Sequence, residues 1–179
     1  MSRCCCEHSV GSEAMRRWVA ASIALLGLAA LPAPSLAQTL QENAHSCTDP
    51  QSSSDLRIKS CTALIDSGQV SRQSLAGVFN NRAAAYYSEN DNAHAIADFT
   101  RAIELDPNLP GAHYNRGDAY LANKEYERAI ADYDAAISAN PQDAWAYHDR
   151  GLAERHLGRM AHSEADITKA RSIDPSVGK

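Results

Sequence analysis

Residues 110–143 read PGAHYNRGDAYLANKEYERAIADYDAAISANPQD, and this stretch predicts two helices followed by a stop. In its first half, four residues recur at three- and four-residue steps and so lie on one face of a helix, namely His113, Arg116, Gly117 and Tyr120. After a polar break at 123–125, the second half repeats this spacing with a more apolar face, namely Tyr126, Ala129, Ile130, Tyr133, Ala136 and Ile137. Pro141 ends the second helix, because proline cannot continue a helix and pushes the preceding residue out of the α region.

The chain matches itself when it is shifted by 34 residues. Residues 76–109 share twelve identical positions with 110–143, and residues 144–177 form a third, more diverged copy. Six positions are identical in all three copies: Arg82/Arg116/Arg150, Ala85/Ala119/Ala153, Ala97/Ala131/Ala165, Asp98/Asp132/Asp166, Ala102/Ala136/Ala170 and Pro107/Pro141/Pro175. A fixed period of this length is typical of proteins in which each helix pair buries its apolar face against the next pair. Because no strand-like alternation occurs in 76–177, we predict an all-α solenoid of helix–turn–helix units.

These units resemble the tetratricopeptide repeat (TPR), whose pattern is a bulky residue, a small residue, Tyr, Ala, an aromatic residue, Ala and Pro at fixed steps. The first copy meets the pattern with Phe79, Ala83, Tyr86, Ala95, Phe99, Ala102 and Pro107. The second copy meets it with His113, Gly117, Tyr120, Ala129, Tyr133, Ala136 and Pro141. The third copy meets it with Tyr147, Gly151, Ser163, Ile167, Ala170 and Pro175. There Glu154 replaces the tyrosine and Arg171 replaces an isoleucine, so we expect the third unit to be looser or partly wet.

The first 37 residues have the three parts of a secretory signal peptide. The basic start at 15–17 precedes an uncharged apolar run from Trp18 to Leu31, and the small residues Ser35 and Ala37 suit cleavage after Ala37. A membrane-spanning helix needs about 20 apolar residues, so an uncleaved anchor is the less favoured alternative. Met15 would itself make a well-formed start. The segment predicts export to a bacterial periplasm or the cell exterior.

Between the signal peptide and the repeats, Ile58, Cys61, Leu64 and Ile65 have helical spacing. We interpret residues 55–75 as a degenerate N-terminal capping helix, which protects the open end of a solenoid. Residues 38–54 contain Asp49-Pro50 and three consecutive serines, and we interpret them as an extended loop. The predicted organisation is therefore 1–37 signal peptide, 38–54 loop, 55–75 capping helix, and TPR units 76–109, 110–143 and 144–177.

Removal of the signal peptide leaves two cysteines, Cys47 and Cys61. An even pair in an exported protein predicts a disulfide, with two free thiols as the alternative. The remaining chain keeps 14 of the 17 basic and 20 of the 22 acidic residues. A protein that binds nucleic acid needs a basic patch, so this acidic balance argues against a nucleic-acid partner.

The recurring Arg/Asp pairs are interpreted as structural ion pairs, namely Arg82 with Asp98, Arg116 with Asp132 and Arg150 with Asp166. Catalytic groups occur once per active site, whereas these pairs repeat with the scaffold. No Ser-His-Asp, Cys-His or glycine-rich phosphate motif is present in the sequence. We therefore predict no enzyme activity and no cofactor. The alternative is a ligand- or metal-binding protein that uses histidines, although His148 and His156 are too far apart to share one ion.

The resemblance implies a protein-interaction scaffold, in which the first helix of each unit lines a concave groove for a peptide or protein segment. The predicted groove residues are Asn80, Ala84, Tyr87, Ser88, Tyr114, Asp118, Leu121, Ala122, Trp145, His148, Leu152, Arg155 and His156. Trp145 beside Leu152 and Arg155 has the composition of a binding hot spot. The alternative for Trp145 is that it packs against the previous unit.

Some members of the family hold a terminal carboxylate of a chaperone with lysines, an arginine and asparagines on these inner helices. Here Asn115 matches one such position, but Asn80, Trp145 and Asp149 occupy the lysine and arginine positions. We therefore do not expect docking to heat-shock chaperones. A membrane-tethered assembly factor, held by an uncleaved signal segment, is a further alternative. Only residues 176–179 follow Pro175, so the last helix leaves an edge that its charged residues Glu164, Lys169 and Arg171 cap or, as the alternative, that self-association covers.

Overall fold

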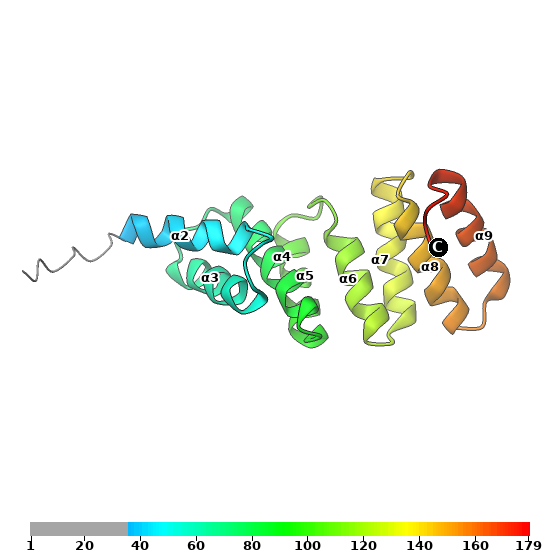
Figure 1. Ribbon diagram of the computed structural model, residues 1–179, viewed down its shortest axis with the longest axis horizontal. Helices are drawn as coiled ribbons and strands as arrows, with labels where there is room; N and C mark the ends of the chain where they lie inside the picture. The colour runs from blue at the N-terminus through cyan, green and yellow to red at the C-terminus, as the bar shows by residue number, and fades with distance from the viewer. Residues whose placement is uncertain (1–35) are drawn as a thin grey trace, which may run out of the picture. The chain divides into compact units, whose positions relative to one another are not determined.

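The structure of the protein is a computed structural model, and it describes residues 36–179 (Figure 1). The predicted signal segment lies outside this part apart from Leu36 and Ala37, and so does the alternative start at Met15. Within the described residues, no helix combines the length and the apolar character that crossing a membrane requires.

Residues 36–179 fold into eight helices and contain no strand. In chain order the helices are α2 (Leu36–Thr48), α3 (Ser54–Ser67), α4 (Arg72–Ser88), α5 (Asn92–Leu105), α6 (Ala112–Ala122), α7 (Tyr126–Ala139), α8 (Ala144–His156) and α9 (Met160–Ile173). Each helix packs against the next one, and α4 also contacts α6 as α6 contacts α8 (Figure 1). This packing of consecutive helices confirms the predicted all-α solenoid.

The three repeat copies each contain one helix pair. The pairs are α4 with α5, α6 with α7, and α8 with α9. The first helix of the first copy starts earlier than the repeat register, because the hydroxyl of Ser71 accepts a hydrogen bond from the backbone N–H of Ser74 and caps α4 there. Residues 72–75 therefore belong to α4 and not to the expected capping helix.

The interpretation of residues 38–54 as an extended loop is wrong, because α2 occupies Leu36–Thr48. The stretch is rich in Leu, Ala, Gln and Glu, which favour helix, and Leu40 packs against the buried cluster around Cys47 and Cys61. Only residues 49–53 connect α2 to α3. A complete helix pair, rather than one capping helix, therefore precedes the three repeat units.

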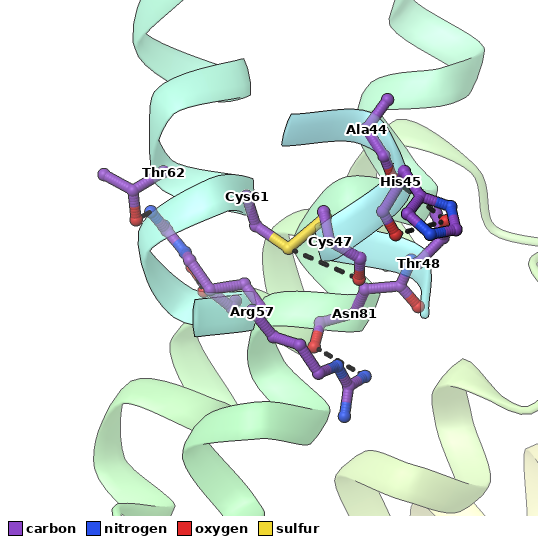
Figure 2. Close-up of a disulfide and its surroundings, with 10 residues drawn as sticks. Ala44, His45, Cys47, Thr48, Arg57, Cys61, Thr62 and Asn81 are labelled. Carbon is purple, nitrogen blue, oxygen red and sulfur yellow. Dashed lines mark hydrogen bonds and ion pairs between the residues drawn. A yellow bond between two sulfur atoms is a disulfide. The ribbon is translucent and has the colours of Figure 1, made fainter. Parts of the chain in front are cut away.

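The predicted disulfide joins Cys47 on α2 to Cys61 on α3, with 5.0 Å between their Cα atoms (Figure 2). Both cysteines are fully buried and pack with Leu64 and with Val78 of α4. Close by, the guanidinium of Arg57 donates to the backbone carbonyl of Asn81 on α4 (Figure 2). The disulfide thus ties the first helix pair together at the place where it contacts the first repeat unit.

Each second helix of a repeat ends in the same way. Asp106, Asn140 and Asp174 close α5, α7 and α9 with extended backbone, at φ values of −141°, −136° and −134°. A proline follows each of them, and proline disfavours the α region for the residue before it. The repeated proline therefore sets the length of the second helix in every unit.

The turn between the two helices of each unit contains one left-handed residue. These residues are Asn90, Lys124 and Gly158, with φ values of 61°, 62° and 75°. Asparagine and glycine adopt this conformation readily, whereas a lysine does so at a steric cost. The turn geometry is thus conserved between the copies even where the residue type does not favour it.

Small residues let the two helices of a unit approach closely. A Cβ atom built on Gly117 of α6 would lie 2.8 Å from the ring of Tyr133 on α7. The ring of Tyr133 is fully buried and fills the space beside this glycine. In the third unit, Gly151 meets the backbone of Ser163 in the same manner.

In the third unit, contacts that the other two units lack stand where the residues of the repeat pattern are missing. Glu154, at the tyrosine position, is buried, and its carboxylate accepts a hydrogen bond from Arg159. Val177, after the last helix, is fully buried in a cluster with Ala144 and Ala170. The C-terminal segment therefore covers part of the edge for which self-association was predicted.

Candidate functional site

The Arg/Asp pairs lie between the two helices of each unit. Arg82 of α4 holds Asp98 of α5 with two hydrogen bonds of 2.6 and 2.9 Å. The equivalent bonds are 2.7 and 2.7 Å between Arg116 and Asp132, and 2.8 and 2.6 Å in the third pair, Arg150 with Asp166. A bidentate pair of this kind fixes the relative orientation of the two side chains and also contributes stabilising energy.

Each of these arginines also reaches the second helix of the preceding unit. Arg82 donates to Thr62 on α3, Arg116 donates to Thr100 on α5, and Arg150 donates to Asp134 on α7. Hydrogen bonding to the paired carboxylate raises the pKa of all three arginines. The repeated arginines thus connect three helices each, which is a structural role, and their charges are already matched.

A second polar network lies on the face of the first helices, where the groove was predicted. Tyr114 of α6 donates from its hydroxyl to Asp149 of α8 over 2.7 Å. Tyr133 of α7 donates to Asp118 of α6 over 2.8 Å. The rings of Tyr114 and Tyr133 lie 5.8 Å apart. We call Tyr87, Tyr114, Asp118, Tyr133 and Asp149 the groove cluster.

The electrostatics of the groove cluster are dominated by carboxylates. Burial raises the pKa of Asp118 to about 7, against the effect of the hydrogen bond from Tyr133, and the charges of Asp149 and Asp143 raise it further. Burial, together with the charges of Asp118 and Asp149, also raises the pKa of the three tyrosines of the cluster, Tyr87, Tyr114 and Tyr133. Carboxyl groups of α6 and α8 therefore gather on this face, and the raised pKa leaves Asp118 only partly charged at neutral pH.

Two aromatic residues on this face are exposed. Tyr87 on α4 is 38% exposed and Trp145 at the start of α8 is 52% exposed. The ring of Trp145 meets His148 edge-on at 5.9 Å, and His148 in turn bonds Asp149 at 2.8 Å. About half of Trp145 is thus open to solvent, and its ring contact is with His148 of its own helix.

The remaining predicted groove residues are arranged less uniformly. Leu121 and Leu152 are half-buried on α6 and α8, whereas Arg155 and Ala122 are exposed near the ends of these helices. Ser88 donates to the carbonyl of Ala84 within α4, and the side-chain oxygen of Asn80 is buried without a hydrogen bond. His156 does not contact the groove cluster and instead stacks on Tyr126 of α7, with 4.6 Å between the ring centroids.

Two members of the groove cluster were not predicted to belong to the groove. Tyr133 matches the buried aromatic of the repeat pattern, which assigns it to the core. Its hydroxyl nevertheless reaches Asp118. Asp149 was noted only as a mismatch to the carboxylate-binding pattern. The available signal was that its repeat equivalents are Asn81 and Asn115, so that the third unit alone places a charge there.

A cavity of about 810 Å³ adjoins the groove cluster. Its walls are the loop at 107–111, the start of α6, the last turns of α7 and Asp143. Tyr114 lines the cavity and also belongs to the groove cluster. Among the described residues, no group of three or more His, Cys, Asp or Glu side chains is arranged to hold a metal ion.

Comparison with known proteins agrees with the architecture of repeated helix pairs. Models of the TPR repeat and of the tetratricopeptide repeat match residues 83–124 and 110–143. The crystal structure of MamA is similar with a TM-score of 0.67, at 22% identity, over 78% of each chain. YrrB, described as a TPR protein with an unusual peptide-binding site, has a TM-score of 0.63 at 16% identity, over 69% of this chain and 62% of its own.

A third similar structure was solved with a peptide. The second TPR of Spaghetti (RPAP3), bound to the HSP90 peptide SRMEEVD, has a TM-score of 0.55 at 26% identity, over 57% of this chain and 94% of its own. No curated protein matches the chain in sequence. The repeat models, the helix pairs and the similar structures together show that the chain belongs to the tetratricopeptide-repeat family.

Proposed function

We propose that this protein is a non-catalytic interaction scaffold that binds an extended peptide or protein segment along the face of α4, α6 and α8. The observation that carries the proposal is the exposure of two large aromatic side chains, Tyr87 and Trp145, on this one face. Exposed aromatic residues beside polar groups are typical of binding hot spots. The half-buried Leu121 of α6 and Leu152 of α8 add apolar area on the first helices.

A relative with a bound peptide supports the proposal. The second TPR of RPAP3 is 26% identical, and its structure contains the HSP90 peptide SRMEEVD. We do not transfer that ligand to this chain. Its two glutamates and its aspartate would approach Asp118 and Asp149. Placing like charges opposite one another at an interface costs on the order of several kcal/mol.

We further propose that the protein acts in an oxidising compartment outside the bacterial cytoplasm. The buried Cys47–Cys61 disulfide supports this, since such bonds persist in the periplasm and outside the cell. The signal segment predicted over 1–37 gives the same location. Mass spectrometry of the protein from its native host tests it, with Gln38 expected at the N-terminus.

The histidine-based alternative has less support among the described residues. His148 is bonded to Asp149, and His156 is stacked on Tyr126. The two histidines thus belong to different contacts, and no group of three or more His, Cys, Asp or Glu side chains within residues 36–179 is placed to hold a metal ion. We do not propose a metal-binding function.

Site-specific photo-crosslinking in the native host tests the proposed function. A photoreactive amino acid is placed at Leu121 in the groove and, as a matched control, at Glu127, which is exposed on α7. The proposal predicts a discrete adduct from position 121 that position 127 does not give. Equal adducts from both positions, or an adduct from position 127 alone, would contradict binding along the groove.

A further inference from the structure

The groove brings three carboxyl groups close to one another, and Asp118 among them has no ion pair within the described residues. Asp118, Asp149 and Asp143 act on one another and on the tyrosines of the groove cluster. Arg116 and Arg150, which lie on the same helices as Asp118 and Asp149, are engaged by Asp132 and Asp166.

The basic groups on the groove face itself do not remove this charge. His148 is held by Asp149, which also accepts the hydroxyl of Tyr114. Arg155 is exposed near the end of α8 and has no ion pair among those found in residues 36–179. One oxygen of Asp118 accepts a hydrogen bond from Tyr133. A cation supplied by a partner would therefore meet acceptors that are already positioned.

The walls of the groove suit the stem of a long basic side chain. Lysine and arginine bury their methylene groups along apolar surface and keep the charge at the tip. Their cations are also attracted to aromatic faces. Tyr87 and Tyr114 provide such faces near Asp118, whose carboxylate acts on both tyrosines.

The adjoining cavity extends the same preference. It is lined by the last residues of α7, among them Ala136 and Ala139, and by Asp143. The C-terminal end of a helix carries partial negative charge from its unpaired carbonyl groups. The cavity therefore offers room and a negative environment next to Tyr114.

We infer that the partner is an extended segment carrying a lysine or arginine that enters the groove between Tyr87, Tyr114 and Asp118. This inference rests on the proposed function and names the chemistry of its ligand. Charge complementarity supports this occupant, because the face exposes Tyr87 and Trp145, and no ion pair found within residues 36–179 supplies Asp118 with a cation. The chosen occupant is thus a basic peptide segment, in contrast to the acidic peptide of the relative with 26% identity.

Selection from a displayed library of random peptides tests the inference. The full, oxidised protein is immobilised, and the selected peptides are sequenced and then titrated individually. The inference predicts enrichment of lysine or arginine at one peptide position and depletion of glutamate and aspartate. It also predicts that added sodium chloride weakens the binding, because screening reduces attraction between charges.

Matched variants locate the effect. Asp118→Asn keeps an oxygen that accepts the Tyr133 hydroxyl but removes the charge, and it should weaken a selected basic peptide about tenfold. Glu127→Gln removes the same charge from the exposed face of α7 and should leave the affinity unchanged. Equal effects of the two variants would overturn the inference.

Two other outcomes separate the inference from the proposed function. If the selected peptides are acidic or uncharged and their binding is lost in Trp145→Ala, the inference is wrong while the groove remains the binding site. If no peptide is selected above the background of the bare surface, both the inference and the proposed function are contradicted.

Discussion

The hydroxyl of Tyr114 on α6 donates to the carboxylate of Asp149 on α8, and this 2.7 Å hydrogen bond links the first helices of two successive units. The link lies on the face of the first helices and is separate from the arginine network between helices of each pair. Both residues are half-buried, so the bond contributes to the stacking of the units as well as to the shape of the groove.

Replacement of Tyr114 by phenylalanine should lower the free energy of unfolding by about 1–2 kcal/mol, because the half-buried Asp149 loses one of its two donors. Urea denaturation measures the change. Tyr87→Phe is the control, since Tyr87 is exposed and its hydroxyl should contribute little. An equal loss in both variants would contradict a specific role for the bond between the units.

Asp118 should make stability depend on pH. Its folded pKa is about 7, above the value of about 4 for an unfolded aspartate. The folded state therefore holds the proton more tightly, so its contribution to stability is complete below pH 4 and is lost as the pH rises through 7. The groups that face Asp118 are Tyr87 of α4, Tyr114 of α6, Tyr133 of α7, Asp143 of the following loop and Asp149 of α8.

Denaturation of Asp118→Asn between pH 4 and 8 checks this expectation. The variant should lose most of the decline that the parent protein shows over this range, and it should be more stable than the parent at pH 8. A parallel pH profile in the two proteins would contradict the raised pKa.

The ion pair of the second unit should be costly to break from one side. Asp132→Ala leaves Arg116 and His113 without their shared carboxylate in a mostly buried position. We expect a loss of about 3 kcal/mol, because an orphaned buried charge is strongly destabilising. Thermal or chemical denaturation measures it beside Glu127→Ala, an exposed position for which little change is expected. A greater loss in the control would refute the structural role of the pair.

Much of the fold follows from the sequence because its signals are local and repeated. The prolines at 107, 141 and 175 mark the helix ends, and the 34-residue period aligns Arg116 with Asp132 as it aligns the other pairs. α2 was missed because its helical residues lie beside loop-like Asp49-Pro50 and serines. Its main support is the tertiary contact of Leu40 and Cys47 with α3.

The groove was harder to predict than the fold. Helical periodicity placed Tyr87, Tyr114 and Asp118 on one face, and the structure brings these residues into one electrostatic cluster. Periodicity did not reveal that Tyr133, which the repeat pattern assigns to the core, reaches Asp118. Nor did it reveal that Asp149 bonds Tyr114. Those contacts depend on the rotation of one helix against another, which no single-sequence pattern specifies.

The turn residue Lys124 gives a prediction about stability alone. Its φ of 62° is left-handed, a conformation that favours glycine. Lys124→Gly should therefore stabilise the protein by about 0.5–1 kcal/mol in urea denaturation. Asn90→Gly in the equivalent turn is the control and should change stability less, since asparagine tolerates this conformation. A destabilised Lys124→Gly protein would show that the lysine side chain has a role that its exposed position does not indicate.

The central claim, that the face of α4, α6 and α8 binds the partner, is tested most directly by titrating a selected peptide against Trp145→Ala. Trp145 is 52% exposed, so we expect a loss of about 2 kcal/mol or more in binding with almost no change in melting temperature. Met160→Ala, at the start of α9 and 61% exposed, should change neither quantity. Unchanged peptide binding together with a large fall in the melting temperature of Trp145→Ala would contradict the groove assignment.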